Sequence, residues 1–303
     1  MDNPLVAIRC PPTHEDKQCC ICDGQSTKAL YAYHYGGKTS EILQCLECGH
    51  LFMCPVPLTQ LNARTMDATH DAELFGSNFL KASHKHLVIK REINYVKRIL
   101  RSEEFSCSKT PRLLDIGCGT GWTTSIWQEN GFSVVGIEPS IARGQMARDT
   151  YHIPVSNEHI ENFVTEELFD VVVMRHLLEH IENPITMIQK VRSFLKPNGL
   201  LVIVIPNINC IGRYIFKENW EWILPWHLHF YSPETLERLL VKCGFSRLKI
   251  YQMPSPLWYP LALNKARKRK LPYFLSFILI CPIVFLGALL NLNDNMTLIF
   301  RKK

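Results

Sequence analysis

The sequence predicts an α/β fold in which a parallel sheet carries helices on both faces. From Arg112 onward, short apolar runs alternate with segments of helical pattern, an order typical of parallel strands joined by helices. A glycine-rich turn at residues 117–121 follows the first apolar run. Two CxxC pairs lie upstream of this region and predict a separate, small cysteine-rich module.

The expected elements follow one another in a regular order. Apolar runs predict strands, and the stretches between them carry the signals of helices. The best-marked helix follows Ser232, a favoured N-cap residue, begins at Pro233 and ends before Gly244. The expected strands are 113–117, 133–138, 169–175, 200–206, 248–253 and 296–300, and the expected helices are 72–104, 140–150, 184–195 and 233–243.

Composition limits the class of protein. The chain has 303 residues, of which 47% are hydrophobic and 20% charged, so we expect a packed core. The net charge of +6 is too small to indicate a general nucleic-acid binder. Twelve cysteines and no recognisable signal segment favour a reducing compartment, and we expect a cytoplasmic protein. Residues 19–57 carry several of these cysteines and have a loop-like pattern.

Four cysteines of this loop-like segment have the spacing of metal ligands. Cys19 and Cys22 form one CxxC turn, and Cys45 and Cys48 form another. Two such turns make a closed tetrahedral site, so we expect a structural zinc ion. Cys20 could replace Cys19 in the first turn. A redox dithiol is the weaker alternative, because no strand–helix unit surrounds the first CxxC.

The glycine-rich turn is the strongest functional signal. Asp115, Gly117, Gly119 and Gly121 form the pattern D-x-G-x-G-x-G between a predicted strand and a predicted helix. Glycines let the backbone approach a ligand closely, and the helix that follows offers N–H groups to an anionic ligand. Glu138 ends the next strand, where an acidic side chain can accept hydrogen bonds from both ribose hydroxyls. A purely structural turn is the alternative, and it leaves Glu138 unexplained.

Two classes of cofactor fit this pattern. Nicotinamide dinucleotides favour G-x-G-x-x-G, whereas this turn reads G-x-G-x-G. The carboxylate of Asp115 would repel a pyrophosphate but attract an ammonium or sulfonium group. In this turn, Glu138 and the run 169–173, the chain resembles class I S-adenosylmethionine (SAM) dependent methyltransferases. That resemblance implies a Rossmann-like sheet with an antiparallel last strand.

The resemblance extends roughly over residues 112–253 and the last predicted strand. It implies that the turn contacts the methionine part of SAM and that the acidic residue after the second strand binds the ribose. The SAM-binding residues implied are Asp115, Gly117, Cys118, Gly119, Gly121 and Glu138, with His159 and Ile160 beside the adenine and Arg175 near the methionine end.

The acceptor is expected beyond the carboxyl ends of the strands. The stretch 174–180 lies there and resembles ubiquinone-biosynthesis O-methyltransferases, whose corresponding run has two glutamates and a histidine associated with a divalent metal. His176 replaces the first glutamate and is a candidate general base. A helix would bring His176, Glu179 and His180 to one face as candidate ligands of a divalent metal. Packing and helix capping are the alternative roles of Glu179 and His180.

The loop 226–232 supplies further candidates. We expect His227 or His229 to orient or deprotonate the acceptor, with a structural role as the alternative. Tryptophans in the same region could stack on an acceptor, lie at a lipid interface or form a hydrophobic lid. They are Trp220, Trp222, Trp226 and Trp258.

Residues 271–290 are almost all apolar, but Pro282 near their middle favours a broken helix or a hairpin. A single membrane span here would separate the last two strands of one sheet. The basic run 265–270 would attract anionic lipid headgroups. We therefore expect a peripheral membrane contact through 265–290, on the cytoplasmic face, with a buried cover of the substrate pocket as the alternative.

The predicted function is methyl transfer from SAM to a small-molecule, glycan or lipid-linked acceptor, on oxygen. Alternatives are an RNA or protein methyltransferase guided by the zinc ribbon, and a non-catalytic SAM-binding membrane scaffold. No nucleic-acid partner is expected, because the Asp/Asn-Pro-Pro-aromatic motif of base amino-methylation is missing after the strand 169–175. The expected domains are a zinc ribbon at 1–60, a helical linker at 61–110, a methyltransferase core at 111–253 and 294–303, and an insert at 254–293.

Overall fold

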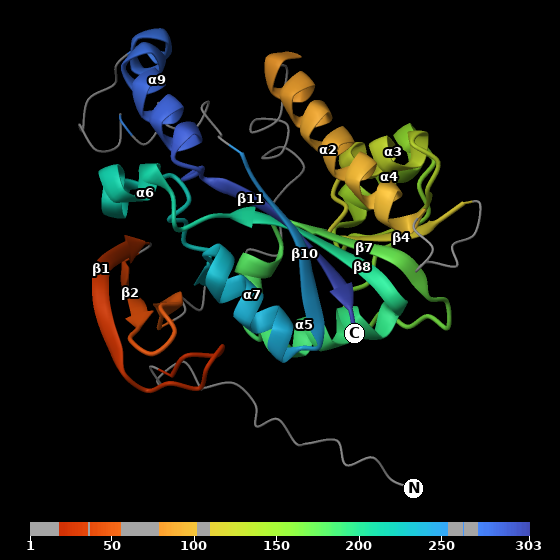
Figure 1. Ribbon diagram of the computed structural model, residues 1–303, viewed down its shortest axis with the longest axis horizontal. Coiled ribbons are helices and arrows are strands. Elements are labelled where there is room, and N and C mark those ends of the chain that lie inside the picture. Colours follow the sequence, from red (N-terminus) through yellow and green to blue (C-terminus); the bar gives the residue numbers. More distant parts are fainter. Residues whose placement is uncertain (1–17, 36, 56–78, 102–109, 254–262, 264–271) are drawn as a thin grey trace, which may run out of the picture.

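The computed structural model describes residues 18–35, 37–55, 79–101, 110–253, 263 and 272–303. A large sheet with helices on both faces forms its centre, and a small sheet lies beside it (Figure 1). Parts of the sequence predictions lie outside the described residues. Among these are Trp258, the basic run 265–270 and both ends, 72–78 and 102–104, of the helix expected over 72–104.

The large sheet confirms the predicted α/β fold. Its strand order over the described residues is β10-β11-β8-β7-β4-β5-β6, and the neighbours from β8 to β6 run parallel. β11 runs antiparallel to both β8 and β10, as predicted for the last strand. The strands are β4 (Arg112–Ile116), β5 (Ser133–Ile137), β6 (Val155–Ser156), β7 (Phe169–Arg175), β8 (Leu195–Pro206), β10 (Phe245–Met253) and β11 (Asn295–Lys302).

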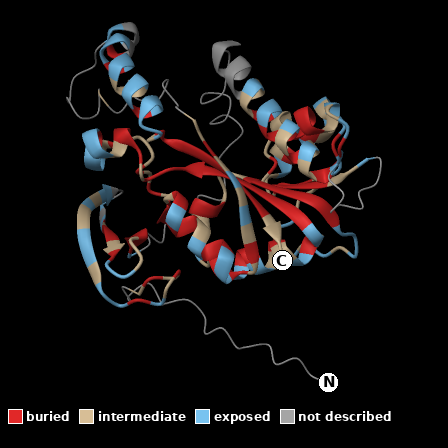
Figure 2. Cartoon of the chain, viewed as in Figure 1, coloured by how far each residue is buried: buried red, intermediate tan, exposed pale blue. Residues whose placement is uncertain are grey.

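Helices cover both faces of this sheet because its strands are apolar on both sides. Val171 and Val173 of β7 lie in one buried cluster with α2 and α3, whereas Val172 and Met174 lie in another with α5 and α7. Each such fully buried side chain contributes about 1.5–3 kcal/mol to folding. Figure 2 shows the resulting buried core along the sheet. The helices are α2 (Phe79–Leu100), α3 (Trp122–Glu129), α4 (Ile141–Tyr151), α5 (Pro184–Phe194) and α7 (Pro233–Lys242).

The loop-like pattern assigned to residues 19–57 was wrong for most of that segment. β1 (Thr27–Tyr35), β2 (Lys38–Cys45) and β3 (Leu51–Cys54) form an antiparallel sheet there. The edge of this sheet is completed by β9 (His229–Phe230), which comes from the loop that follows the large sheet's β8 in sequence. The small sheet therefore holds a segment in which the sequence placed candidate catalytic histidines.

The apolar segment forms one helix, α9 (Tyr273–Leu289), in place of the expected broken helix or hairpin. Pro282 lies inside it and cannot donate the usual hydrogen bond, but one face of the helix packs on α6 (Ile211–Phe216). This packing is close, since a Cβ added at Gly287 would lie 2.8 Å from Ile211 Cγ2. Among the described residues, no helix is both long and apolar enough to cross a membrane.

The turn before α3 requires glycine at residue 121. Gly121 has a φ of +82°, and a Cβ there would lie 2.7 Å from the Cβ of Ala147. We expect Gly121→Ala to lower the free energy of unfolding by about 2–4 kcal/mol, because left-handed backbone and overpacking both contribute. Gly131 is the matched control, with a φ of +85° and no described atom within 4 Å, so Gly131→Ala should cost about 1 kcal/mol. Urea denaturation measures both, and equal losses would contradict the prediction.

Candidate functional site

The glycine-rich turn joins β4 to α3 at the carboxyl edge of the large sheet. Gly117, Gly119 and Gly121 all have positive φ, at 75°, 57° and 82°. Two backbone N–H groups of the turn, from Gly117 and Cys118, donate to the carbonyl of Ile137 at 2.8 and 3.1 Å. This anchors the turn against the end of β5. A Cβ added at Gly119 would meet no described atom within 4 Å beyond its chain neighbours, so a ligand has room to approach the backbone there.

Asp115 lies at the base of this turn and is buried. Thr124 Oγ1 donates to its Oδ2 at 2.5 Å, while its Oδ1 has no hydrogen-bond partner among the described residues. Burial raises the pKa of Asp115, against the opposing effects of Thr124 and of the charge on Arg175. A buried carboxylate oxygen without a partner carries a large desolvation penalty, so a ligand that supplies a cationic donor would fit here.

Glu138 follows β5 directly and is also buried. Its Oε2 accepts a hydrogen bond from the Gly119 N–H at 3.0 Å, and its Oε1 accepts one from the Ser140 N–H at 2.9 Å. Asn157 supports the same corner, because its Nδ2 donates to the Glu138 carbonyl at 2.8 Å. The carboxylate is thus fixed beside the glycine turn, in reach of a ligand that lies across both strand ends.

The other predicted cofactor residues surround this corner. Cys118 is buried, and its Sγ lies 2.5 Å from where a Cβ of Gly136 would be. Ile160 is buried and His159 is exposed. Arg175, at the end of β7, forms an ion pair with Glu92 of α2, and its charge also acts on the adjacent Asp115.

The stretch after β7 does not form the helix that was expected to align three candidate ligands. His176 has a φ of +47°, which no α-helix contains, and only the 3₁₀ helix η2 (Leu178–His180) follows. The segment nevertheless lies against the cofactor turn, because a Cβ at Gly117 would be 3.6 Å from the Leu177 side chain.

Glu179 and His180 meet His227 from the distant loop. One ligand atom from each of these three residues lies within 4.8 Å of the others. Nδ1 of His180 is 2.8 Å from the Trp226 carbonyl, and Nδ1 of His227 is 2.9 Å from the Trp222 carbonyl. A carbonyl accepts only, so both Nδ1 atoms carry protons and both Nε2 atoms offer lone pairs when the rings are neutral.

The Glu179 carboxylate is buried, and neither of its oxygens has a hydrogen-bond donor among the described residues. Burial raises its pKa, but the neighbouring His176, His180 and His227 lower it to about 2. Burial lowers the pKa of His227 to about 3. An ionised carboxylate and a neutral imidazole side by side are the ligand forms that divalent cations require. The residues present therefore fit a metal ion as well as they fit an acid–base group.

His176 lies at the exposed side of this cluster. Its Nδ1 is 3.4 Å from Glu179 Oε1, but the two atoms do not form a hydrogen bond. Its ring stacks on Trp222 with centroids 5.5 Å apart and planes 4° apart, and Trp222 also stacks on His227. Trp220, by contrast, is fully buried in the cluster beneath the small sheet. Of these two tryptophans, Trp222 is the partly exposed one beside the Glu179 cluster.

His229 lies apart from the Glu179 cluster, although it is only two residues from His227. Its Nδ1 is 3.1 Å from Nε2 of His50 and 3.8 Å from Sγ of Cys20. His227 precedes β9 and its ring lies with Glu179 and His180, whereas His229 lies in β9 and its ring lies with Cys20 and His50. The sequence offered both histidines as candidates for the same role.

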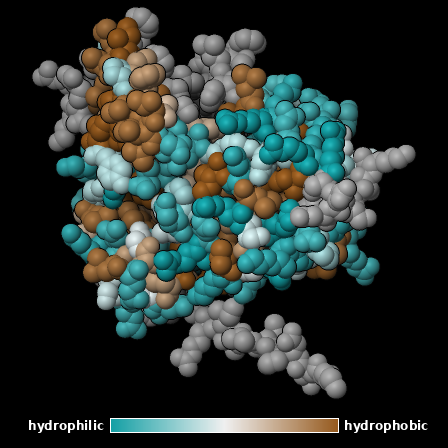
Figure 3. Space-filling model, in the orientation of Figure 1, coloured by the Kyte–Doolittle hydropathy of each residue, from teal (hydrophilic) through white to brown (hydrophobic). Residues whose placement is uncertain are grey.

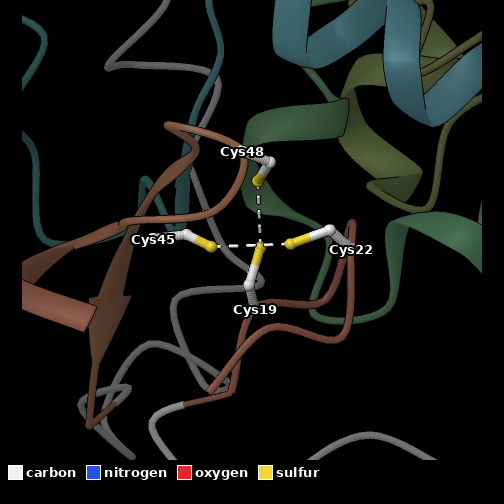
Figure 4. A group of neighbouring side chains, drawn as sticks. All are labelled: Cys19, Cys22, Cys45 and Cys48. Carbon is white, nitrogen blue, oxygen red and sulfur yellow. Dashed lines mark hydrogen bonds between the residues drawn. The ribbon is translucent and has the colours of Figure 1, made fainter. Parts of the chain in front are cut away.

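The four cysteines of the two CxxC turns converge in the N-terminal module (Figure 4). Cys19 Sγ lies 3.5 Å from Cys48 Sγ, and Cys22 Sγ lies 3.5 Å from Cys45 Sγ. Tetrahedral zinc with Zn–S bonds of about 2.3 Å separates its sulfurs by about 3.8 Å. The sulfurs are therefore spaced as a four-thiolate metal site requires, and Cys20 points away from them toward His229.

Two contributors to this region were not found from the sequence. Glu92 of α2 binds both Arg175 and Thr297, whose Oγ1 donates to it at 2.6 Å. His50 follows the second CxxC turn and is fully buried. Glu92 lies on the inward face of the amphipathic helix α2. A charged residue on such a face is seldom buried without a partner, so its position in the sequence could have indicated a buried ion pair.

Comparison with known proteins identifies a family. The model of a family described as a methyltransferase domain matches residues 84–250, more than half of the chain. The chain is 28% identical over 130 residues to a ubiquinone biosynthesis O-methyltransferase of Rhodopseudomonas palustris (strain HaA2), covering 41% of this chain and 51% of that protein. It is 34% identical over 154 residues to the mitochondrial ubiquinone biosynthesis O-methyltransferase of Homo sapiens, covering 45% and 41%. The match thus spans about half the length of these relatives.

A solved structure with the same fold is a SAM-dependent methyltransferase from Archaeoglobus fulgidus. It aligns with a TM-score of 0.52 and 20% sequence identity, over 77% of this chain and 98% of that one. This likeness concerns the fold of the large sheet and its helices.

Proposed function

The chain belongs to the methyltransferase-domain family, and from that premise we propose that it transfers a methyl group from SAM to a hydroxyl of a small-molecule, glycan or lipid-linked acceptor. The observation that carries this proposal is the contact between the glycine turn and the segment 175–180. Leu177 packs against Gly117, so the turn that would hold the donor adjoins the Glu179 cluster. Donor and acceptor could then be held in line for displacement.

Asp115 would bind the methionine part of the donor, and Glu138 would bind its ribose. The unpartnered Oδ1 of Asp115 would accept from the ammonium of SAM, in the low-dielectric interior where such a pair is strong. Glu138 would bind the ribose hydroxyls, with His159 and Ile160 beside the adenine and Arg175 near the methionine end. Gly117, Cys118, Gly119 and Gly121 would line the turn.

Glu179, His180 and His227 would hold a divalent metal ion, which lowers the pKa of an acceptor hydroxyl when it is bound. Glu179 supplies the charge, and the carbonyls of Trp222 and Trp226 fix the two rings. His176 and Trp222 would stack on the acceptor. His176 would also take the proton if no metal were bound. This assignment leaves His229 out of the acceptor site, because its ring contacts His50 instead.

Cys19, Cys22, Cys45 and Cys48 would bind a structural zinc ion. The spacing of their sulfurs supports this, as does the location of Cys19 and Cys45 in the buried core. A closed four-thiolate site serves folding rather than catalysis. In this chain it would fix the small sheet, and through β9 the loop that carries His227.

The proposal is tested by transfer of radiolabelled methyl from SAM into a lysate of cells that lack the protein. The lysate is separated into lipid, glycan, small-molecule, RNA and protein fractions. We expect label in one of the first three, in an alkali-stable ether linkage. Label in RNA or protein would contradict the proposal and would indicate that the small sheet recognises the RNA or protein substrate.

Glu138→Gln is the matched variant for this assay. It keeps the size of the side chain but removes the charge that would bind the ribose, so we expect SAM affinity to fall about 10- to 100-fold. Isothermal titration measures the dissociation constant. Glu158→Gln, at an exposed position nearby, should leave it unchanged. Full SAM binding by Glu138→Gln would contradict the assignment. If the wild-type protein binds SAM but gives no labelled product, a non-catalytic SAM-binding scaffold is favoured.

We also propose that α9 attaches the protein peripherally to a membrane. Ile280 is buried, but the opposite side of the helix exposes Leu275, Leu279, Phe285 and Leu289. Figure 3 shows the apolar surface that gathers over α9. An exposed apolar stripe on one helix is typical of binding in the plane of a lipid interface. The basic run that precedes the helix in sequence adds attraction for anionic headgroups.

A variant with Leu279, Phe285 and Leu289 all changed to Asn should lose at least about 90% of its affinity for vesicles that contain anionic lipid, because each apolar side chain contributes more than 1 kcal/mol to insertion. Co-sedimentation with vesicles measures this binding. Val164→Asn, at another exposed apolar position, is the control. If the triple variant binds as the wild type does, attachment through α9 is wrong. A concentration-dependent dimer that the triple variant loses would indicate a second copy as the occupant.

A further inference from the structure

A second cluster of metal-ligating side chains lies between the small sheet and the large one. Cys20 precedes β1, His50 lies between β2 and β3, and His229 lies in β9. One ligand atom from each lies within 4.8 Å of the others. His229 Nδ1 is 3.1 Å from His50 Nε2 and 3.8 Å from Cys20 Sγ. None of the three belongs to the four-cysteine cluster or to the acceptor site.

Hydrogen bonds within this cluster leave a buried ring nitrogen without a partner. His50 and His229 are both buried. A neutral imidazole has one N–H, and the His50–His229 contact uses one proton of the pair. The backbone of Ile181 and Glu182 lies beside the His229 ring, whereas His50 Nδ1 has no hydrogen-bond partner among the described residues. A pair selected only for hydrogen bonding would satisfy this atom as well.

We propose that Cys20, His50 and His229 bind a second zinc-like divalent ion. Tetrahedral zinc with Zn–S of about 2.3 Å and Zn–N of about 2.0 Å separates sulfur from nitrogen by about 3.5 Å and the nitrogens by about 3.3 Å. The observed separations of 3.8 and 3.1 Å are close to these values. Binding would deprotonate the Cys20 thiol and release one proton to solvent, and the metal would take a lone pair from each ring.

Tyr231 lies beside the two histidines of this cluster. Its ring centroid is 5.1 Å from that of His50 and 5.8 Å from that of His229. The ring is buried, and its hydroxyl has no hydrogen-bond partner among the described residues. This unpartnered hydroxyl would be the group that holds a water as the fourth ligand.

The ion would join two parts of the chain that are far apart in sequence. Cys20 and His50 belong to the N-terminal module, whereas His229 follows His227 of the acceptor site by two residues. The β3–β9 ladder already links these parts through the Phe52–His229 pair. A metal bond at His229 would fix the same segment more rigidly and so hold the acceptor loop to the module.

Metal content of the full-length protein tests the proposal. Atomic emission should find one equivalent of zinc fewer in Cys20→Ser and in His50→Gln than in the wild type, with the four-thiolate zinc retained in both. Cys281→Ser, which removes an exposed thiol from α9, is the control and should match the wild type. Equal metal content in the wild type, Cys20→Ser and His50→Gln would overturn the proposal.

If a variant loses both ions because the module unfolds, zinc-edge X-ray absorption of the folded protein tests for the second site instead. It is measured on Glu179→Gln, which lacks the carboxylate of the acceptor cluster. Nitrogen ligands beside the sulfur ligands support the site, and a pure sulfur shell overturns it. Neither readout depends on methyl transfer, so failure of this inference is distinguishable from failure of the proposed function.

Discussion

Glu179→Gln is expected to reduce the rate of methyl transfer by about 10²–10⁴-fold, the usual contribution of a positioned acid–base or metal-activated group. The substitution keeps the volume of a buried side chain but removes its charge. His180 and His227 would then face a neutral amide, and neither a metal ion nor a protonated imidazole would be stabilised there. Single-turnover assays with saturating SAM measure the rate, because they separate the chemical step from cofactor binding.

The affinity for SAM should not change in this variant, since Glu179 lies outside the glycine turn. Glu182→Gln provides the matched control, because Glu182 is exposed three residues away and should keep the full rate. Added Mn²⁺ or Mg²⁺ should stimulate metal-depleted wild type but not Glu179→Gln. A variant that retains the wild-type rate would show that the Glu179 cluster is a structural feature and would move the acceptor site elsewhere.

The sequence predicted the large sheet well because its signals are local. Each parallel strand is an apolar run that ends at a polar or glycine residue. The glycine pattern of residues 117–121 is specific, because few kinds of turn require glycine at these three positions. Ser232 and Pro233 marked α7 to within one residue of its end. The same local logic correctly put Asp115 and Glu138 at neighbouring strand ends, because parallel strands share a carboxyl edge.

Side chains brought together by tertiary structure were harder to predict. The expected helix would have aligned His176 with Glu179, but the positive φ of His176 prevents it. His227 lies beside Glu179 because its loop is held there by the hydrogen bond from His180 to the Trp226 carbonyl. No pattern in the local sequence indicates this long-range contact. In the small sheet, the tyrosine-rich alternation of β1 is a strand pattern that the density of cysteines obscured.

Loss of the four-thiolate metal is expected to unfold the small sheet. Structural zinc in small modules contributes about 10–16 kcal/mol of binding free energy, which is comparable to the whole stability of a typical domain. Cys45→Ser should therefore abolish amide-exchange protection in β1, β2 and β3, while β4 and β7 of the large sheet remain protected. Hydrogen exchange followed by mass spectrometry measures each segment separately.

The same change should reach the acceptor site, because β9 pairs with β3 through Phe52 and His229. Without that partner the loop that carries His227 loses its fixed position, and a displacement of about 1 Å can lower a rate about 100-fold. We therefore expect Cys45→Ser to bind SAM normally yet transfer methyl slowly. Cys281→Ser, an exposed thiol loss on α9, should change neither protection nor rate. Retained protection of β1 and β2 in Cys45→Ser would mean that apolar packing alone maintains the small sheet.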